Sequence, residues 1–216
     1  MTIDMTRDQT REEIIYRFAC WAAASAARQG SKMRGRSWYK PINKIRGNLK
    51  ELLSDAKPSP QKFATWHQVV VKKLCDDTGE TVGWAAKILN MLTKVEVYLS
   101  GLGHPELKDL IHPPIDNGLI DAVVERCHKG YWDDDNETIK RLCSKGKPIN
   151  SIKKYAQYME VIKGLQLVAN CMQCSLFEVE RLWGQEICMP ISRFFEASVA
   201  VVRLTLRKRS VSSSLG

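Results

Sequence analysis

The aspartate at position 116 has the setting that most favours chemistry. It follows two consecutive prolines in the segment 111–120, which reads Ile-His-Pro-Pro-Ile-Asp-Asn-Gly-Leu-Ile. Proline restricts its own backbone and that of the residue before it, so the side chain that comes next is presented at a defined place. Asp116 then lies at the start of a helix predicted over 118–127, where N–H donors and the positive end of the helix dipole keep a carboxylate ionised. The other interpretation is that Asp116 only caps this helix.

A hairpin of two helices precedes this segment. The apolar spacing predicts helices over 61–74 and 84–99, joined by a turn over 75–83 that is rich in glycine and other turn-forming residues. Such turns leave backbone N–H groups exposed beside a helix N-terminus, where they can bind a phosphate oxygen without reading the base sequence. Ordinary helix pairs also turn on glycine, so the hairpin alone does not establish a phosphate site. The candidate donors are Gly79, Val82 and Gly83.

Two further side chains near these motifs could take part in a reaction. Lys87 lies among apolar residues of the second hairpin helix. A lysine in this setting is either a desolvated nucleophile or extends its amine to the surface, and the pattern favours the second. His112, four residues before Asp116, could orient water or a leaving group. A structural histidine with satisfied hydrogen bonds is the more common case.

The chain is basic, and part of its positive charge is concentrated in one segment. It contains 33 lysines and arginines against 24 acidic residues, a formal net charge of +9. Between positions 28 and 50 there is no acidic residue, and Trp38 and Tyr39 lie among the basic ones. This composition is typical of contact with nucleic acid phosphates, although a solvated loop and helix face would also fit. The candidate contact residues are Lys32, Arg34, Arg36, Lys44 and Arg46.

Helical periodicity dominates the chain. We predict an all-α fold, a compact helical domain with a helix-hairpin-helix element and no substantial sheet, because no stretch alternates with a period of two. The domain is expected to cover 1–188, with the hairpin at about 66–100 and the aspartate element at 111–127. A basic C-terminal extension with a disordered end is expected over 189–216. The other predicted helices cover 10–28, 42–53, 151–174 and 175–183.

The cysteines do not indicate a metal or redox site. Their number, seven, is odd, and they are scattered through helical patterns, which is typical of reduced thiols. Cys171 and Cys174 are spaced like half a zinc site, but no second pair follows, and Cys188 alone does not complete a set of four ligands. We therefore predict no metal and no cofactor.

The hydropathy pattern gives an expectation about location. No stretch reaches the roughly 18 to 20 apolar residues of a membrane helix, and the first residues lack the core of a signal peptide. We expect a soluble cytoplasmic protein with no membrane partner. No obligate protein partner is evident either.

These features together resemble the helix-hairpin-helix DNA glycosylases. The resemblance rests on a hairpin with a glycine turn, an intervening helix, and a Pro-Ile-Asp element that opens the next helix, over roughly residues 66–127. It is nearest to the archaeal 8-oxoguanine glycosylase branch, in which a lysine-bearing hairpin precedes a Pro-Val-Asp or similar element. The alanine-rich first helix adds a looser similarity.

The resemblance implies an activity and gives the candidate residues roles. In that family the aspartate lies near the deoxyribose C1′ and stabilises the oxocarbenium-like state formed as the base departs, which would be the role of Asp116. The base must be flipped from the stack, so the pocket needs flat side chains. Tryptophan also suits a hydrophobic core. The expected partner is double-stranded DNA with a modified or damaged base, and the pocket candidates are Trp21, Trp84 and Trp183, with Trp38.

The sequence departs from the family where bifunctional members place a lysine that attacks C1′. Aligning the hairpin turns puts Glu80 or Thr81 at that position, and the nearest lysine is Lys87, 29 residues before Asp116. We therefore expect a monofunctional enzyme with water as the nucleophile, acting in base excision repair or in the restriction of modified phage DNA. The four-cysteine run that holds an iron–sulfur cluster in other branches is absent. The alternative function is a non-catalytic helical protein that binds DNA or RNA.

Overall fold

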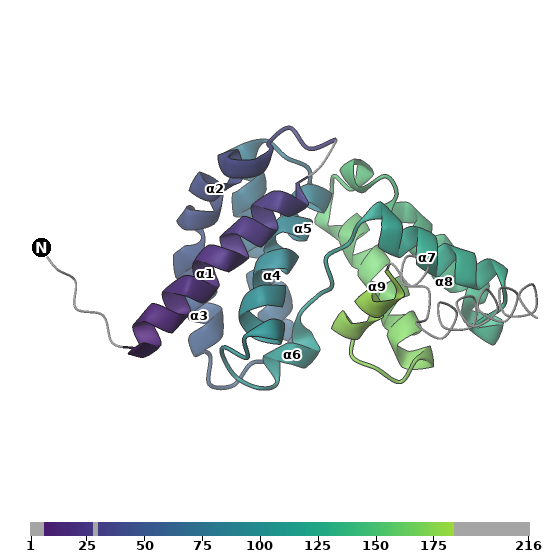
Figure 1. Cartoon of the computed structure of the whole chain (residues 1–216). Helices are drawn as coiled ribbons and strands as arrows, with labels where there is room; N and C mark the ends of the chain where they lie inside the picture. Colours follow the sequence, from purple (N-terminus) through teal and green to yellow (C-terminus); the bar gives the residue numbers. More distant parts are fainter. Residues whose placement is uncertain (1–6, 28–29, 184–216) are drawn as a thin grey trace, which may run out of the picture. The chain divides into compact units, whose positions relative to one another are not determined.

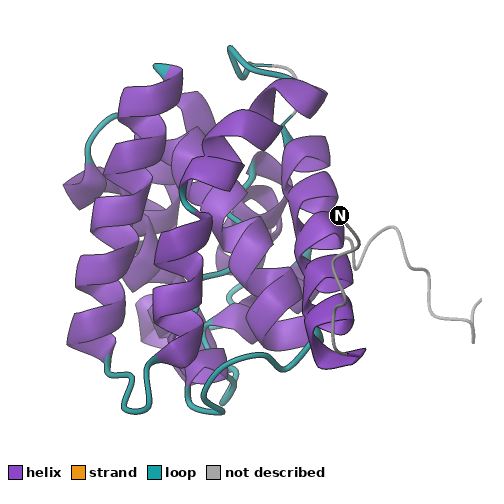
Figure 2. Ribbon diagram, turned by 90° about the vertical axis from the view of Figure 1, so that its left-hand side faces the viewer, coloured by secondary structure: helices purple, strands orange, loops and turns teal. Residues whose placement is uncertain are grey.

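A computed structural model of the chain describes residues 7–27 and 30–183. The chain divides into two units, Met1–Glu180 and Arg181–Gly216. Within the described residues there are helices and loops but no strand (Figure 2). The all-α prediction is therefore confirmed. The predicted domain boundary at 188 and the segment 189–216 lie outside the described residues.

The first half of the fold is organised around α5 (Val82–Thr93). Its sequence is apolar almost all round, and Ala85, Ile88 and Leu92 are fully buried. A helix of this composition must be covered on every side. It packs against α1 and α4, and α2 and α3 lie beside α4 (Figure 1). The bounds of these helices are α1 Arg7–Ala26, α2 Tyr39–Lys44, α3 Arg46–Ser54 and α4 Pro60–Thr78.

The second half contains the short α6, which precedes the proline-rich segment, and the helices α7, α8 and α9, which follow it. Helix α8 packs against both α7 and α9, and α9 also contacts α5 (Figure 1). The buried side chains of Ile111 and Ile115 anchor the proline-rich segment on either side of the prolines. The bounds are α6 Leu107–Leu110, α7 Asn117–His128, α8 Asn136–Cys143 and α9 Tyr155–Cys171, with a short 3₁₀ helix at Phe177–Leu182.

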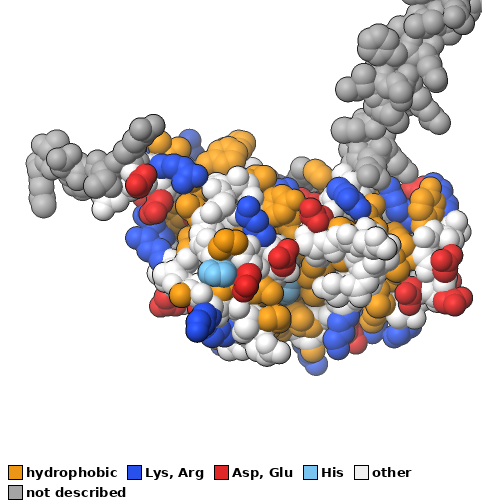
Figure 3. Space-filling model, turned by 90° about the horizontal axis from the view of Figure 1, so that it is seen from below, with side chains coloured by type: hydrophobic (Ala, Val, Ile, Leu, Met, Phe, Trp, Pro, Cys, Tyr) orange, Lys and Arg blue, Asp and Glu red, His pale blue; other side chains and the backbone are white. Residues whose placement is uncertain are grey.

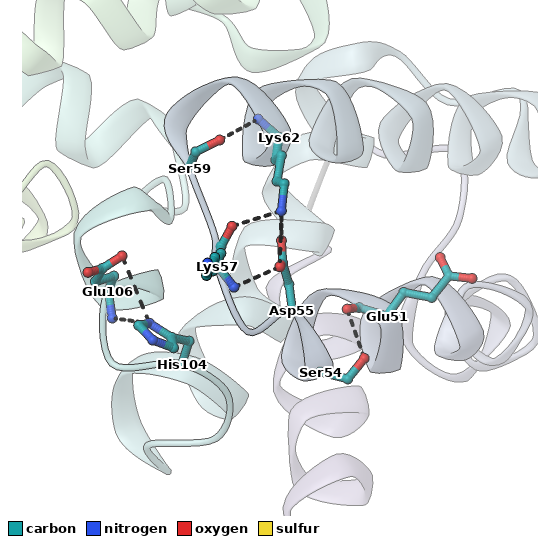
Figure 4. A network of polar contacts seen from close by, with 8 residues as sticks. All are labelled: Glu51, Ser54, Asp55, Lys57, Ser59, Lys62, His104 and Glu106. Carbon is teal, nitrogen blue, oxygen red and sulfur yellow. Dashed lines mark hydrogen bonds and ion pairs between the residues drawn. The ribbon is translucent and has the colours of Figure 1, made fainter.

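The break between α3 and α4 shows how local sequence sets a helix start. Ser59 caps α4 by accepting a hydrogen bond of 3.3 Å from the Lys62 N–H, and Pro60 occupies the first turn, where its missing N–H costs nothing. The Lys62 amine reaches back to the Asp55 carboxylate at 3.2 Å and to the Lys57 carbonyl at 2.8 Å (Figure 4). These contacts tie the loop to the first turn of α4.

Helix boundaries differ from the predicted ones at three places. The helix predicted over 42–53 is divided into α2 and α3 at Ile45, whose backbone leaves the helical region. The helix predicted over 84–99 continues after α5 as a π-helical turn, Lys94–Leu99. The hairpin turn is also shorter than predicted, because α4 runs on to Thr78 and ends at Gly79 in the left-handed conformation, φ +68°.

Candidate active site

Two of the predicted residues, Lys87 and Asp116, meet inside the fold. Lys87 lies in the middle of α5 and Asp116 directly before α7, and the Lys87 Nζ is 3.5 Å from the Asp116 Oδ2. The lysine side chain is 8% exposed and the aspartate side chain 23%. An amine and a carboxylate in such a partly dehydrated site interact more strongly than the same pair at the surface. The fold thus brings together two reactive groups that are distant in sequence.

The orientation of Asp116 follows from the prolines and from α7. Pro113 and Pro114 are buried, and Asp116 has the extended backbone of a capping residue, φ −143° and ψ 175°. Its Oδ1 accepts a hydrogen bond of 2.9 Å from the Leu119 N–H. The prediction that Asp116 starts the helix is confirmed. Because Oδ1 caps α7, the other oxygen is held toward Lys87.

Lys87 does not extend its amine to the surface. Its neighbours in α5 are buried on both sides, and the residue as a whole is only 6% exposed. The Nζ lies 5.3 Å from the centroid of the Trp84 ring, within the range of a cation–π interaction. The expectation that Lys87 reaches solvent is wrong, because α5 has no solvent-facing side at this turn. The alternative interpretation, a lysine whose amine is shielded from solvent, agrees with the burial of Lys87.

A second ion pair lies near the first. Lys94, seven residues after Lys87, places its Nζ 2.6 Å from the Glu180 Oε1. Burial raises the pKa of Glu180, the hydrogen bond from Lys94 lowers it, and the negative charge of Asp116 adds to the upward shift. The charges of Asp116 and Glu180 therefore influence each other. Two lysines and two carboxylates share this region.

A buried hydrogen-bond network supports the segment that leads to Asp116. The Asn90 amide group donates to the Pro113 carbonyl at 2.9 Å and to the Tyr158 hydroxyl at 3.0 Å, and its oxygen is 2.9 Å from Nε2 of His67. The Tyr158 hydroxyl is also 2.8 Å from Nδ1 of His112. All four side chains are buried, so their polar atoms need partners within the protein.

The donors and acceptors of this network fix which ring nitrogen of His67 carries the proton. The Asn90 oxygen can only accept, so His67 carries its proton on Nε2 and accepts from the Tyr155 hydroxyl, 2.9 Å from Nδ1. The Tyr158 hydroxyl accepts from Asn90, and its oxygen is 2.8 Å from Nδ1 of His112. Burial lowers the pKa of His67 to about 4 and that of His112 well below its ordinary value. Both rings are neutral.

His112 has a structural role in this arrangement. The prediction that it orients water or a leaving base is not supported, because it is buried and its ring hydrogen-bonds to Tyr158. Asn90 acts on Asp116 indirectly, since it holds the Pro113 carbonyl three residues before the aspartate. The sequence prediction missed Asn90 and Tyr158. A signal was present for Asn90, a polar residue inside the apolar run 88–92.

The neutral state of His67 makes stability depend on pH. In the unfolded chain His67 has the ordinary pKa of about 6.5, whereas in the fold its pKa is about 4. As the pH falls, the unfolded state therefore takes up a proton on His67 before the folded state does. The contribution of neutral His67 to the free energy of unfolding is complete above pH 6.5 and is lost as the pH falls toward 4. Between neutral pH and pH 4.5 the wild type should lose about 2 to 3 kcal/mol more than His67→Phe.

Urea unfolding followed by circular dichroism at several pH values measures this difference. His67→Phe is less stable than the wild type at neutral pH, since it leaves Asn90 without a partner. The comparison therefore concerns the pH slopes rather than the absolute values. Equal slopes for the two proteins would show that His67 is not held neutral by the fold.

The basic segment is partly neutralised by distant carboxylates. Lys44 pairs with Asp77 of α4 at 2.6 Å, and Arg46 pairs with Glu13 of α1. The face shown in Figure 3, which is seen from below and so from the side away from α2, also has acidic side chains among basic ones. Two of the predicted contact residues therefore also hold helices together. The segment in addition exposes Lys32, Arg34, Arg36, Lys40 and Lys50.

The hairpin turn uses its glycine N–H groups internally. Gly79 donates to the Cys75 carbonyl at 2.8 Å, and Gly83 donates to the Ile152 carbonyl at 3.0 Å. The prediction that these two groups bind a phosphate is corrected, because carbonyls of the chain already accept their hydrogen bonds. Lys32 donates to the Gly79 carbonyl at 2.6 Å and brings a positive charge to the turn. Val82, partly exposed at the start of α5, stays a prediction.

The candidate tryptophans have different surroundings. Trp38 is fully buried and donates its indole N–H to the Met33 carbonyl at 3.1 Å, so it belongs to the core. Trp84 lies beside Lys87, and within the described part of the chain its buried Nε1 has no hydrogen-bond partner. Trp21 is exposed on α1, and Trp183, also exposed, belongs to the second unit. Trp84 is therefore the tryptophan that accompanies the pair.

The cysteines show no metal arrangement in the residues that can be described. Across 7–27 and 30–183, no three His, Cys, Asp or Glu side chains are placed to hold an ion. Cys171 is exposed and Cys174 half-buried, and Cys188 lies outside the described residues. Among the described helices, none is long and apolar enough to cross a membrane.

No protein-family model, curated protein or solved structure matches this chain. Its function is therefore inferred from its own residues.

Proposed function

We propose that this protein is a DNA glycosylase that flips a damaged or modified base out of duplex DNA and cuts its N-glycosidic bond at Lys87 and Asp116. The observation that carries the proposal is the contact of these two side chains, 3.5 Å apart. Burial of the lysine and capping of α7 by the aspartate hold both groups in place. A preorganised pair of this kind suits a reaction that develops positive charge at one carbon.

Asp116 supplies the electrostatic part of the proposed reaction. Breaking an N-glycosidic bond builds positive charge on the sugar, and a fixed carboxylate near C1′ stabilises that charge more in the transition state than in the ground state. Only such a difference lowers the barrier. The Leu119 N–H and the Asn90 contact with Pro113 keep the carboxylate from turning away.

Lys87 is the proposed nucleophile, in place of the water expected from the sequence. The proton that its ammonium group loses ends on the departing base. The amine lone pair then forms a bond to C1′ while the electrons of the N-glycosidic bond leave with the base. Loss of a second proton to water and opening of the sugar ring give an imine between Lys87 and the sugar. The proximity of Lys87 to Asp116 supports this route.

The surroundings of the pair support binding of a flipped base in duplex DNA. Trp84, which is 3% exposed, lies beside Lys87 and has a buried N–H without a partner in the described residues; a base that displaces the neighbours of the ring could supply the acceptor. Lys32, Arg34 and Arg36 are exposed and suited to phosphate contacts. The proposed substrates are an oxidised guanine, as in repair, or a hypermodified pyrimidine of phage DNA, as in antiviral defence. The location that we propose for this enzyme is the cytoplasm.

A non-catalytic protein that binds DNA or RNA is the second candidate. The observation in its favour is that Asp116 caps α7 with one oxygen and pairs with Lys87 through the other. Both contacts also make sense as stabilisation of a helical fold. In that case the basic segment would bind the nucleic acid, and Lys87 and Asp116 would take no part in a reaction.

Strand cleavage distinguishes the two candidates. Duplexes that carry oxidised, deaminated, alkylated or hypermodified bases are incubated with the protein, and strand breaks are measured before and after hot alkali. Breaks without alkali are the expected result, since an imine at C1′ leads to strand cleavage. Breaks that appear only after alkali would support a glycosylase in which water, rather than Lys87, is the nucleophile. Binding to every duplex without any break would favour the non-catalytic protein.

A further inference from the structure

A cavity of about 600 Å³ opens between α1, α3 and the turn that follows the π-helical segment. Its volume lies in the range of small-molecule sites, which is about 300 to 1,000 Å³. None of its lining residues belongs to the Lys87 and Asp116 pair. The lining residues that matter for ligand chemistry are Glu12, Tyr16, Arg46, Leu49, Leu53 and Glu96.

Glu96 is the unusual residue of this cavity. It lies in the π-helical segment, is 3% exposed, and within the described part of the chain its Oε2 has no hydrogen-bond partner. Burial raises the pKa of this carboxyl to about 7, the charge of Arg46 lowers it, and that of Glu12 raises it. A buried acceptor without a partner is costly unless something supplies a donor.

The nearby arginine is already engaged elsewhere. Arg46 forms an ion pair with Glu13, and its guanidinium lies 4.1 Å from the centroid of the Tyr16 ring. Its charge acts on Glu96, but no hydrogen bond or ion pair between the two is found among the described residues. Lys50 is exposed at the rim. The charges of Arg46 and Glu13 neutralise each other. Of the remaining charged residues that line the cavity, Glu12 and Glu96 are acidic and only Lys50 is basic, so negative charge is in excess.

We propose that this cavity binds a small organic cation, an amine or amidinium group carried on an apolar body. The ligand's N–H donates to the Glu96 carboxylate. Its apolar part contacts Leu49 and Leu53 and the loop residue Leu102, which line the same cavity. A metal ion fits less well, since no group of three possible ligands is arranged for one in the described residues. This inference is independent of the proposed glycosylase activity.

Binding of three matched compounds to the full-length protein tests the proposal. Benzylamine, benzyl alcohol and benzoate share a ring and differ in charge, and chemical-shift titration gives their dissociation constants. Benzylamine should bind at least about tenfold more tightly than the other two, because a hydrogen bond to a charged group is stronger than one between neutral groups. Equal binding of the three compounds would overturn the proposal.

Two variants locate the site. Glu96→Gln keeps the shape of the side chain and should weaken benzylamine by about tenfold. Glu51→Gln, an exposed carboxylate of α3 that does not line the cavity, should have no effect. Leu102→Trp fills the cavity without touching the charge, and should abolish binding even if Glu96→Gln folds poorly. Unchanged affinity in both Glu96→Gln and Leu102→Trp would place the compound elsewhere.

The pH dependence gives an independent readout. Because the pKa of Glu96 is about 7, benzylamine should bind more tightly as the pH rises through that value and Glu96 ionises, while benzylamine stays protonated. The other titratable and charged groups facing Glu96 are Glu12, Glu13, Tyr16 and Cys20 on α1 and Arg46 and Lys50 on α3. The pH dependence should disappear in Glu96→Gln. A slope retained in that variant would contradict the role of Glu96.

Discussion

Replacing Asp116 by asparagine should slow release of the base by at least about 100-fold, the usual cost of losing one electrostatic group aimed at a transition state. Asparagine keeps the size of the side chain and remains a good helix cap, so α7 should stay intact. Only the negative charge that faces Lys87 is lost. The affinity for duplex DNA should stay the same, because the phosphate contacts are made elsewhere. Single-turnover release of the base and a DNA-binding titration measure the two quantities.

Asp121→Asn is the matched control for this experiment. Asp121 lies on the same helix, is exposed, and pairs with Lys147 away from the site. Its replacement changes the net charge by the same amount, so any general effect of charge on DNA binding would be seen in both variants. Equal rates for Asp116→Asn and the wild type would mean that Asp116 only caps α7.

Gly83→Ala should destabilise the fold by about 3 kcal/mol or more, as expected for a methyl group forced into a packed interior. A Cβ at this position would lie 2.1 Å from the carbonyl oxygen of Ile149 and 3.1 Å from its carbonyl carbon. Backbone atoms cannot move aside as a flexible side chain would, so the start of α5 would be pushed from the chain before α9. The hydrogen bond from Gly83 to Ile152 would be lost with it. Urea unfolding gives the change in the free energy of unfolding.

Gly47→Ala provides the comparison. Gly47 lies in α3, and apart from its chain neighbours and the backbone of its own helix no heavy atom is within 4 Å of the place where its Cβ would be. Alanine in a helix interior is better than glycine by about 0.5 to 1 kcal/mol; Gly47 is the second residue of α3, so the gain in stability over the wild type should be at or below the lower end of this range. If both alanine variants changed the free energy of unfolding by the same amount, the close contact at Gly83 would not explain the loss of stability in Gly83→Ala.

The class of fold could be predicted from the sequence, but several helix boundaries could not. The apolar spacing of α1, α5 and α9 is local information, and it is sufficient to predict helices. The interruption at Ile45 and the π-helical turn after Thr93 carry no such signal. Packing against other helices decides where a helix ends once several residues have similar helix propensity.

The candidate site was predicted only in part, because its supporting contacts are distant in sequence. Asp116 could be found from the prolines before it, since their effect is local. Asn90 contacts His67, Pro113 and Tyr158, which lie 23 to 68 residues away. Nothing local indicates such partners. The same limit explains Lys87, whose burial depends on the neighbours of α5 rather than on its own flanking residues.

The basic segment illustrates the same point for charge. Its own sequence has no acid between positions 28 and 50, yet Asp77 and Glu13 supply the carboxylates that pair with Lys44 and Arg46. A count of charges along the chain therefore overstates the free positive surface. Lys32 is also engaged within the fold, because its amine donates a hydrogen bond to the Gly79 carbonyl in the hairpin turn.

The most direct test of the Lys87 and Asp116 site avoids the question of which base is removed. A duplex with an abasic site presents the sugar aldehyde that Lys87 would attack, and borohydride reduces the resulting imine to a stable bond between protein and DNA. The wild type should be trapped, with the modified peptide containing Lys87. Lys87→Gln should not be trapped, whereas Lys72→Gln, which removes an exposed lysine of α4, should behave as the wild type. Trapping of Lys87→Gln at the wild-type level, or no trapping of the wild type, would contradict a reactive amine at this site.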